Sequence, residues 1–202
     1  MNISTVDIIC LYNPNKPERR MNIENMLGKL DLNATYVSGT DGAVPTLISI
    51  FSERLTNWKP FILMEDDCSY TEWFTYSFSC PENTDGVFIG ISPCSTDLNK
   101  EEDNHVWKFD YENVTGFTDI VKINNMLSTH AFYIHSERWC THLIELWTHI
   151  NETYIKNGTF KHYDVPIART MRNFNIYALR FPMFYQDPIV GGQGVTLTHF
   201  PC

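Results

Sequence analysis

Three consecutive carboxylates, Glu65-Asp66-Asp67, are the side chains of this sequence most able to do chemistry. They directly follow the apolar run Phe61-Ile62-Leu63-Met64, which is typical of a short buried strand. Ionised carboxylates that are packed together repel one another and lose hydration, so a cluster at the end of a core strand favours a bound cation. The sequence therefore predicts a divalent-metal site at the mouth of a sheet. A solvated acidic turn without a ligand is the alternative.

The elements that would position this cluster follow from the hydrophobic pattern. Strands are predicted over 6–12, 34–38 and 61–64, and helices over 17–30 and 46–58. This β-α-β-α-β order favours a largely parallel sheet with right-handed crossovers, in which ligands bind beyond the carboxyl ends of the strands. The rest of the chain predicts short helices, strands and loops in the following order: a helix over 70–79, a strand over 86–92, an exposed loop over 95–104, strands over 106–109, 119–123 and 129–134, a helix over 137–150, a helix from Asp164 to 173 and a strand over 175–179.

Length and composition narrow the class of protein. The 202 residues suit one domain, and the contents of 43% hydrophobic and 19% charged residues are those of a soluble globular protein. The net charge of −9 and the lack of a basic run argue against a duplex nucleic acid as partner. No signal peptide and no membrane span of ~20 apolar residues is seen, so we expect a cytoplasmic protein with unoccupied glycosylation sequons. The six cysteines lack zinc spacing and are expected to be free thiols.

Several segments, taken in order, resemble glycosyltransferase family 25, which includes bacterial lipooligosaccharide galactosyltransferases and procollagen galactosyltransferases. The resemblance extends from about residue 6 to 187. Only the Glu-Asp-Asp segment is specific by itself, and the others gain weight from their order. Tyr12 and the glycine-rich stretch after Gln186 depart from the family pattern. The segments are Asn13, Pro17-Glu18-Arg19-Arg20, Asp41-Gly42, residues 61–67, residues 128–134 and residues 181–187.

The resemblance implies a GT-A-like (Rossmann-like) α/β fold in a single glycosyltransferase domain over 1–202, with a nucleotide-sugar donor and Mn²⁺ or Mg²⁺. It implies that Asp67 is a direct metal ligand, with Asp66 bridging to the metal or the ribose and Glu65 beside them. Such hard oxygen ligands suit these ions, which often bind one or two carboxylates together with substrate phosphates. His199 is a candidate for a further ligand.

Donor binding is predicted for Arg19, Arg20 and Asp41, for which surface charge or an ordinary turn are the alternatives. His130 and Gln186 are predicted to face the donor or the acceptor, although His130 could equally be a core histidine. Trp73, Tyr163 and Tyr185 are candidates for stacking on sugars, with core burial as the alternative.

A transferase that inverts configuration needs a general base near the acceptor hydroxyl. Asp164 is the first candidate and Asp187 the second, and the alternative for Asp164 is a helix N-cap.

The predicted function is metal-dependent transfer of a hexose from a UDP-sugar to a hydroxyl of a glycan, a protein or a small molecule. A metal-dependent nucleotidyltransferase or phosphotransferase on a similar sheet is one alternative. A non-catalytic relative that binds nucleotide-sugars or carbohydrates is another. The sequence contains no P-loop and no Gly-x-Ser-x-Gly elbow, which argues against P-loop enzymes and α/β-hydrolases.

Overall fold

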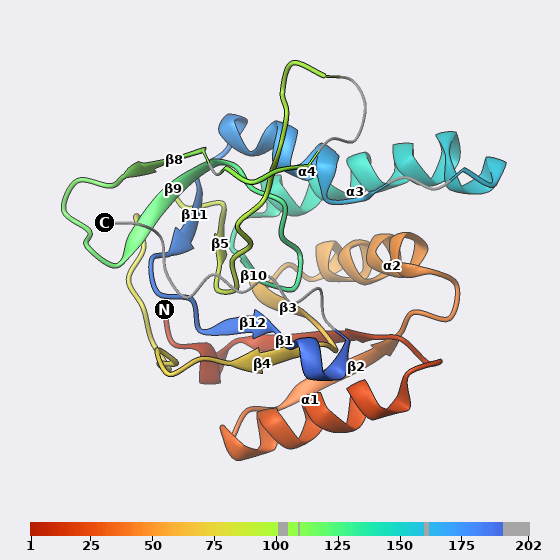
Figure 1. Cartoon of the computed structure of the whole chain (residues 1–202), viewed down its shortest axis with the longest axis horizontal. Coiled ribbons are helices and arrows are strands. Elements are labelled where there is room, and N and C mark those ends of the chain that lie inside the picture. The colour runs from red at the N-terminus through yellow and green to blue at the C-terminus, as the bar shows by residue number, and fades with distance from the viewer. Residues whose placement is uncertain (101–104, 109, 160–161, 192–202) are drawn as a thin grey trace.

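An eight-stranded sheet forms the centre of the protein and separates two hydrophobic cores (Figure 1). The computed structural model describes residues 1–100, 105–108, 110–159 and 162–191. The strand order is β2-β1-β3-β10-β5-β11-β9-β8. These strands are β1 (Asp7–Tyr12), β2 (Ala34–Ser38), β3 (Phe61–Glu65), β5 (Gly86–Phe88), β8 (Asp110–Asn113), β9 (Ile120–Asn125), β10 (Ala131–Ile134) and β11 (Ile176–Leu179).

Most strands of this sheet point the same way. β1 pairs in parallel with β2 and β3, and β5 pairs in parallel with β11. β10 runs antiparallel between β3 and β5, and β9 runs antiparallel between β11 and β8. The chain is therefore a single α/β domain with a mostly parallel, mixed sheet, as the sequence predicts.

Helices cover both faces of the sheet (Figure 1). α1 (Pro17–Lys29) lies on one face, together with the small ribbon formed by β4 (Cys68–Tyr70) and β12 (Phe184–Gln186). α2 (Ala43–Thr56), α3 (Glu137–Thr153) and α4 (Val165–Thr170) lie on the other face. A second ribbon pairs β6 (Ser95–Thr96) with β7 (His105–Val106). Four short 3₁₀ turns complete the described elements: η1 (Ile3–Thr5), η2 (Ile155–Asn157), η3 (Met171–Asn173) and η4 (Pro188–Val190).

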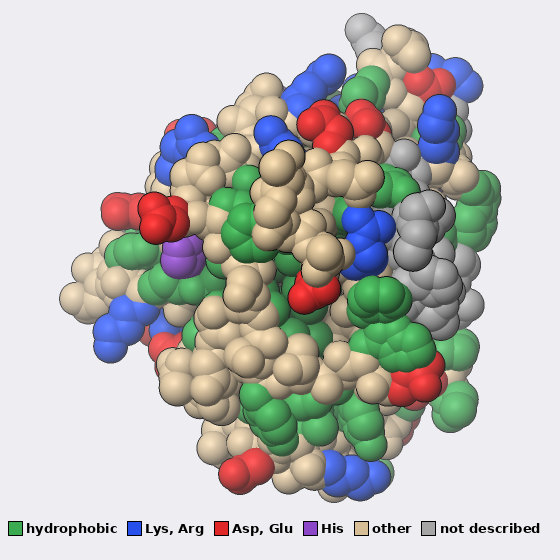
Figure 2. Space-filling model, turned by 90° about the vertical axis from the view of Figure 1, so that its left-hand side faces the viewer, with side chains coloured by type: hydrophobic (Ala, Val, Ile, Leu, Met, Phe, Trp, Pro, Cys, Tyr) green, Lys and Arg blue, Asp and Glu red, His purple; other side chains and the backbone are tan. Residues whose placement is uncertain are grey.

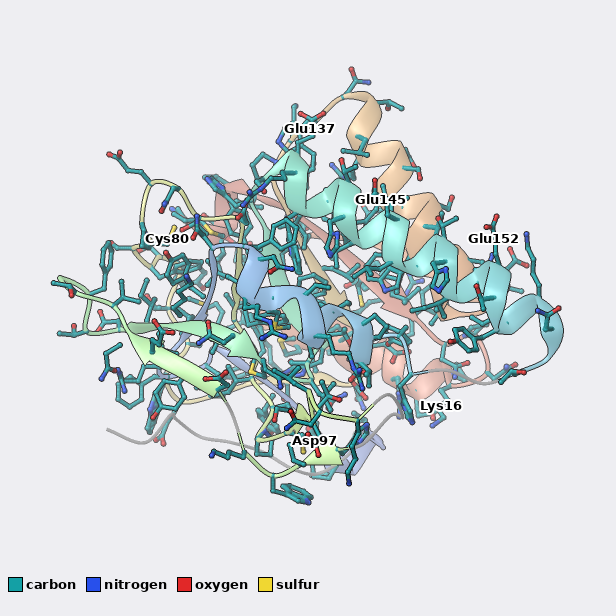
Figure 3. All side chains as sticks on the ribbon, turned by 90° about the horizontal axis from the view of Figure 1, so that it is seen from above. Lys16, Cys80, Asp97, Glu137, Glu145 and Glu152 are labelled. Atoms are coloured by element: carbon teal, nitrogen blue, oxygen red, sulfur yellow. The ribbon has the colours of Figure 1, made fainter. Side chains whose placement is uncertain are left out.

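The central strands are continuous apolar runs because both of their faces are buried. In β1, Ile9 and Leu11 enter the core under α2 and α3, whereas Ile8 and Cys10 enter the core under α1. α3 is amphipathic instead. Trp139, Leu143 and Trp147 are buried, and Glu137, Glu145 and Glu152 lie along its outer side (Figure 3). This pattern determines which side of α3 packs against the sheet. The carboxyl ends of the strands remain open for a site.

The predicted β-α-β-α-β order over the first third is confirmed, with element ends shifted by no more than a few residues. Two local predictions are wrong. The helix expected over 70–79 does not form, because Cys68–Tyr70 pairs with β12 and Ile3 pairs with the backbone of Tyr76. The segment expected as an exposed loop from 95 begins instead with the buried strand β6, whose Thr96 is held by the side chain of Asn125.

Further surface features bear on the class of protein. Lys and Arg side chains lie scattered among acidic and apolar ones on the face shown in Figure 2, with no continuous basic stripe over the part of that face that the structure describes. None of the described helices is long and apolar enough to cross a membrane. Free thiols are found at Cys10, Cys68, Cys80, Cys94 and Cys140. Cys202 lies outside the described residues.

Candidate functional site

The carboxylate cluster lies where β3 leaves the sheet. Glu65 is the last residue of β3, opposite Leu11 of β1, and its backbone N–H donates to the carbonyl of His130 at 2.8 Å. Asp66 and Asp67 form the turn into β4 and are only 4% and 5% exposed. Burial of this degree does not fit the solvated acidic turn that the sequence left open. Carboxylates held this far from water need cationic or hydrogen-bonding partners.

Arg19 of α1 supplies positive charge to this turn. Its Nη1 lies 3.4 Å from Asp66 Oδ1 and 3.4 Å from Asp67 Oδ2. Its Nε donates to the carbonyl of Val190 at 2.8 Å, and its Nη2 donates to the carbonyl of Gly191. Asp66 also accepts a hydrogen bond from the backbone N–H of Asn13 at 2.7 Å. Arg19 is thus fixed between the acidic turn and the segment after β12.

Asp67 is less well satisfied than Asp66. Its Oδ1 is buried and has no hydrogen-bond partner among the described residues. Burial raises the pKa of the Asp67 carboxyl, although the nearby Arg19 guanidinium lowers it. Leaving a buried carboxylate oxygen unpartnered costs free energy, so this oxygen is suited to accept a cation.

Glu65 is held by two hydroxyl groups on one oxygen. Thr129 Oγ1 and Tyr163 Oη each donate to Glu65 Oε1 at 2.8 Å. Gln186 Nε2 lies 3.5 Å from Glu65 Oε2 and 3.5 Å from Asp67 Oδ2. Burial, followed by the negative charge of Asp67, raises the pKa of Glu65 to about 7. The second oxygen of Glu65 therefore lacks a short hydrogen bond, and the Gln186 amide is equally far from it and from Asp67 Oδ2.

The larger of two cavities beside this cluster opens at the carboxyl ends of β1, β2 and β3. It encloses ≈ 420 Å³, within the usual range for small-molecule sites. Its described walls carry one cationic side chain, that of Arg19. They are made by Leu11, Tyr12, Asn13, Asn15, Arg19, Gly39, Thr40, Gly42, Ala43, Glu65, Asp66 and Tyr163.

The N-terminus of α2 faces this larger cavity through Gly42 and Ala43. Gly42 adopts φ +96°, a conformation that favours glycine, and no side chain caps the helix. The first N–H groups of an uncapped helix are free to bind an anion, and the helix dipole adds to the attraction. Together with Arg19, this end of α2 makes the larger cavity suited to a phosphorylated ligand.

The smaller cavity encloses ≈ 190 Å³ on the other side of Glu65. Two carboxylates, Glu65 and Asp164, and three imidazoles lie in its walls, and none of its described lining residues is Lys or Arg. The lining residues are Glu65, Ser92, Cys94, His105, Leu127, Ser128, Thr129, His130, His162, Tyr163, Asp164 and Gln186. This chemistry suits a hydroxyl-bearing ligand better than a phosphate.

Two predicted residues of the smaller cavity have clear local environments. Asp164 precedes α4 at the N-cap position, but its side chain makes no capping hydrogen bond to that helix. His130 is 2% exposed, its Nδ1 lies 3.1 Å from Ser128 Oγ, and burial lowers its pKa to about 4. Its Nε2 packs so closely on Gly90 that a Cβ there would overlap it. His130 is therefore a neutral imidazole in the inner wall.

Some predicted residues are not brought to either cavity. Arg20 pairs with Glu24 at 2.7 Å, and its guanidinium stacks on the rings of Tyr12 and Tyr36. Asp41 is exposed in the loop before α2, outside the described cavity walls. Asp187 accepts from the N–H of Ile189 at 2.9 Å and caps η4. His199 lies outside the described residues.

The predicted stacking residues also differ from one another. Trp73 packs against Phe181, with ring centroids 5.8 Å apart, and Tyr185 lies in the β4–β12 ribbon. Tyr163 is the one that reaches both cavities, through a hydroxyl contact that sequence reasoning did not anticipate. The role of Thr129 was also missed. The sequence did contain one sign of this contact: Thr129 stands just before the strand Ala131–Ile134 and beside the predicted site residue His130.

The carboxylates fit a divalent cation in part. No group of three His, Cys, Asp or Glu side chains within the described ranges forms a complete metal site. Asp67 Oδ1 and Glu65 Oε2 nevertheless offer hard, weakly satisfied oxygens beside Asp66. Mg²⁺ and Mn²⁺ commonly take one or two such ligands and fill the remaining positions with substrate phosphates and water. The donor set therefore fits an ion that binds together with a phosphorylated substrate.

No protein-family model and no curated protein matches the sequence. Among solved structures, the fold is similar to CTP:phosphocholine cytidylyltransferase (LicC) from Streptococcus pneumoniae, with 12% identity, a TM-score of 0.44, and coverage of 89% of this chain and 72% of that one. It is also similar to an apo UDP-glucose pyrophosphorylase, with 12% identity, a TM-score of 0.45, and coverage of 92% and 78%. A glycosyltransferase involved in glycosylation of the major capsid of PBCV-1 matches at 7% identity and a TM-score of 0.36, with coverage of 85% and 92%. At these values the similarities assign neither a family nor a function, and the resemblance to glycosyltransferase family 25 stays a prediction.

Proposed function

We propose that this protein is a metal-dependent glycosyltransferase that moves a hexose from a nucleotide-sugar, a UDP-hexose, to a hydroxyl group of an acceptor, with inversion. One observation carries the proposal. A cavity suited to a phosphorylated ligand and a second cavity suited to a hydroxyl compound meet at a buried carboxylate cluster.

The larger cavity is the proposed donor site. Arg19 and the N-terminus of α2 would bind the diphosphate, since a guanidinium and free helix N–H groups both favour phosphate oxygens. Asp67 and Glu65 would hold Mn²⁺ or Mg²⁺, with Asp66 beside them. The metal would stabilise the negative charge that develops on the departing diphosphate.

The smaller cavity is the proposed acceptor site, and Asp164 is the proposed general base. In the transfer, the acceptor oxygen forms a bond to the anomeric carbon, the bond from that carbon to the phosphate oxygen breaks, and the acceptor proton passes to Asp164. Asp164 lies in the wall of this cavity, and its side chain makes no capping hydrogen bond to α4. Attack from the cavity opposite the diphosphate would invert the configuration at the anomeric carbon.

The residues that line the smaller cavity support the nucleotidyltransferase alternative less well. Such an enzyme brings a phosphate-bearing nucleophile to the α-phosphate of a nucleotide, and that nucleophile needs cations around it. The described walls of the smaller cavity contain carboxylates and no Lys or Arg. A neutral acceptor hydroxyl is the better partner for them. A non-catalytic binding protein would require neither the second cavity nor a carboxylate such as Asp164 in its wall.

A screen of nucleotide-sugars tests the proposal. Release of the nucleoside diphosphate and of the free sugar would be followed with each UDP-, GDP- and CDP-sugar, with Mn²⁺ and with EDTA. We expect slow hydrolysis of a UDP-hexose that needs Mn²⁺. Exchange of radioactive pyrophosphate into UTP in the presence of hexose 1-phosphate would instead identify a nucleotidyltransferase.

Binding gives a second, independent readout of the same proposal. A ligand that binds only the folded state raises stability by RT ln(1 + [L]/Kd), which is about 2.7 kcal/mol at one hundred times the Kd. We therefore expect Mn²⁺ with UDP to raise the melting temperature by several degrees. A melting temperature unchanged by saturating Mn²⁺ and UDP would count against the donor site itself.

A further inference from the structure

Glu65 and Tyr163 line both cavities, and the bond between them separates the two spaces. The hydroxyl of Tyr163 donates to Glu65 Oε1 at 2.8 Å. No other described residue belongs to both linings. The diphosphate-binding side and the side with Asp164 therefore meet at this one hydrogen-bonded pair.

A donor that occupies the larger cavity must bring its hexose to this pair. The groups suited to phosphate, Arg19 and the start of α2, lie in the larger cavity, whereas Asp164 and Gln186 lie only in the smaller one. The anomeric carbon has to be reached from the smaller cavity, so the hexose must lie at the boundary between the two. The Tyr163 hydroxyl and a hexose hydroxyl would then compete for the same carboxylate of Glu65.

The two donors to Glu65 Oε1 are not equivalent in position. Thr129 lines only the smaller cavity, and its bond to Glu65 orients the carboxylate from one side. Tyr163, by contrast, lines both cavities. Removing either hydroxyl deletes one hydrogen bond to the same atom, but only the change at Tyr163 alters the boundary.

We propose that Tyr163 is a positioning residue that closes the passage between the donor and acceptor cavities through its bond to Glu65, and that it competes with a hydroxyl of the donor hexose for that carboxylate. The proposal rests on the proposed glycosyltransferase function and deepens it. It assigns to Tyr163 the task of keeping water in the smaller cavity away from the anomeric carbon. Without its hydroxyl the ring is no longer tied to Glu65, and both the hexose and water reach the boundary more easily.

The test compares Tyr163→Phe with Thr129→Val and the unchanged protein. Binding of UDP and of UDP-galactose would be measured by titration calorimetry with Mn²⁺, and hydrolysis of UDP-galactose by release of UDP. UDP ends at the diphosphate, so we expect Tyr163→Phe to leave its Kd within twofold. UDP-galactose should bind about three- to tenfold more tightly to Tyr163→Phe, the range expected when one hydrogen bond no longer has to be displaced.

Hydrolysis gives the second arm of this test. Water attacks the anomeric carbon, the bond to the UDP oxygen breaks, and free galactose and UDP are released. We expect this rate to rise about three- to tenfold in Tyr163→Phe and to change less in Thr129→Val. Melting curves of both variants check that they remain folded.

The outcomes separate the two levels of the proposal. If UDP with Mn²⁺ does not bind the unchanged protein, the glycosyltransferase proposal fails, and the role of Tyr163 fails with it. If UDP binds but Tyr163→Phe changes UDP and UDP-galactose equally, only the boundary role fails. An equal rise of hydrolysis in Thr129→Val would assign the effect to the orientation of Glu65, and would also overturn the boundary role.

Discussion

The two cavities are built from the chain in different ways. Apart from Tyr163, the larger cavity comes from the first third of the sequence, at the ends of β1, β2 and β3 and in the loops that follow them. The smaller cavity is assembled from short segments scattered between Glu65 and Gln186. Their chemistry differs as well, because the larger one contains Arg19 and a free helix N-terminus and the smaller one contains carboxylates without Lys or Arg in its described walls.

This contrast indicates that the two cavities depend on different features of the chain. Consecutive β-α units bring their loops to one end of the strands of a parallel sheet, which produces a surface suited to phosphate with few long-range contacts. The second surface needs β10 to run antiparallel beside β3 and needs the segment before α4 to reach Glu65. The proposed donor cavity thus depends on local order in the chain, whereas the proposed acceptor cavity depends on how distant segments pack. The following changes test this contrast.

The largest effect is expected in the acidic turn beside the two cavities. Asp67→Asn keeps the shape of the side chain but removes the charge of the oxygen that has no partner. We expect donor hydrolysis with Mn²⁺ to fall by about 10⁴-fold or more, because stabilisation of the leaving diphosphate by the metal, several kcal/mol, is lost. The melting temperature should not fall, since a buried charge is removed. Asp119→Asn, an exposed change outside both cavities, is the control, and wild-type turnover by Asp67→Asn would contradict the metal assignment.

The next effect is confined to the smaller cavity. Asp164→Asn should reduce transfer to an acceptor by about 10²- to 10⁴-fold, the usual contribution of a general base. Binding of UDP with Mn²⁺ should be unchanged, because Asp164 does not line the larger cavity. Melting curves of Asp164→Asn check that the variant remains folded. Transfer within tenfold of the wild-type rate would show that the base is another group.

A third change acts on the larger cavity alone. Arg19→Gln should weaken UDP binding by about tenfold or more, because a hydrogen bond to a charged group contributes more than a neutral one. Arg20→Gln is the matched control. Arg20 stacks on Tyr12 and Tyr36 and pairs with Glu24, so its loss should change the Kd for UDP by less than twofold. The Kd for UDP would be measured by calorimetry. Equal changes of this Kd in the two variants would show that Arg19 has no special role in binding UDP.

The smallest effect concerns how Glu65, which lines both cavities, makes the stability of the protein depend on pH. The pKa of Glu65 is raised from 4.5 to about 7 in the folded protein. The folded state therefore holds a proton that the unfolded state releases, and stability falls as the pH rises through this window. Glu65→Gln should melt a few degrees higher than wild type above pH 7, and the difference should shrink below pH 4.5. Glu72→Gln, at an exposed position outside both cavities, is the control in thermal melts at pH 4, 6 and 8.

The sequence by itself determined the first third of the fold and the place of the acidic cluster. Local signals specify these elements: the apolar runs of β1 and β3, and the apolar periodicity of the helix beginning at Ala43. Each signal strongly favours one type of secondary structure. A charged triplet at the end of a core strand likewise predicts a site at the sheet edge, wherever the other strands lie. Arg19 and Arg20, by contrast, are adjacent and equal in the sequence.

Only the tertiary structure decided which of the two arginines meets the carboxylates. Successive residues of a helix point about 100° apart, so Arg19 reaches Asp66 while Arg20 lies against Tyr12 and Tyr36. The pairing of Cys68–Tyr70 with Phe184–Gln186 likewise overrode the helix expected over 70–79 and brought Gln186 beside Glu65. Contacts between residues some hundred positions apart, such as Tyr163 with Glu65, depend on the path of the whole chain, and no local pattern of residues encodes them.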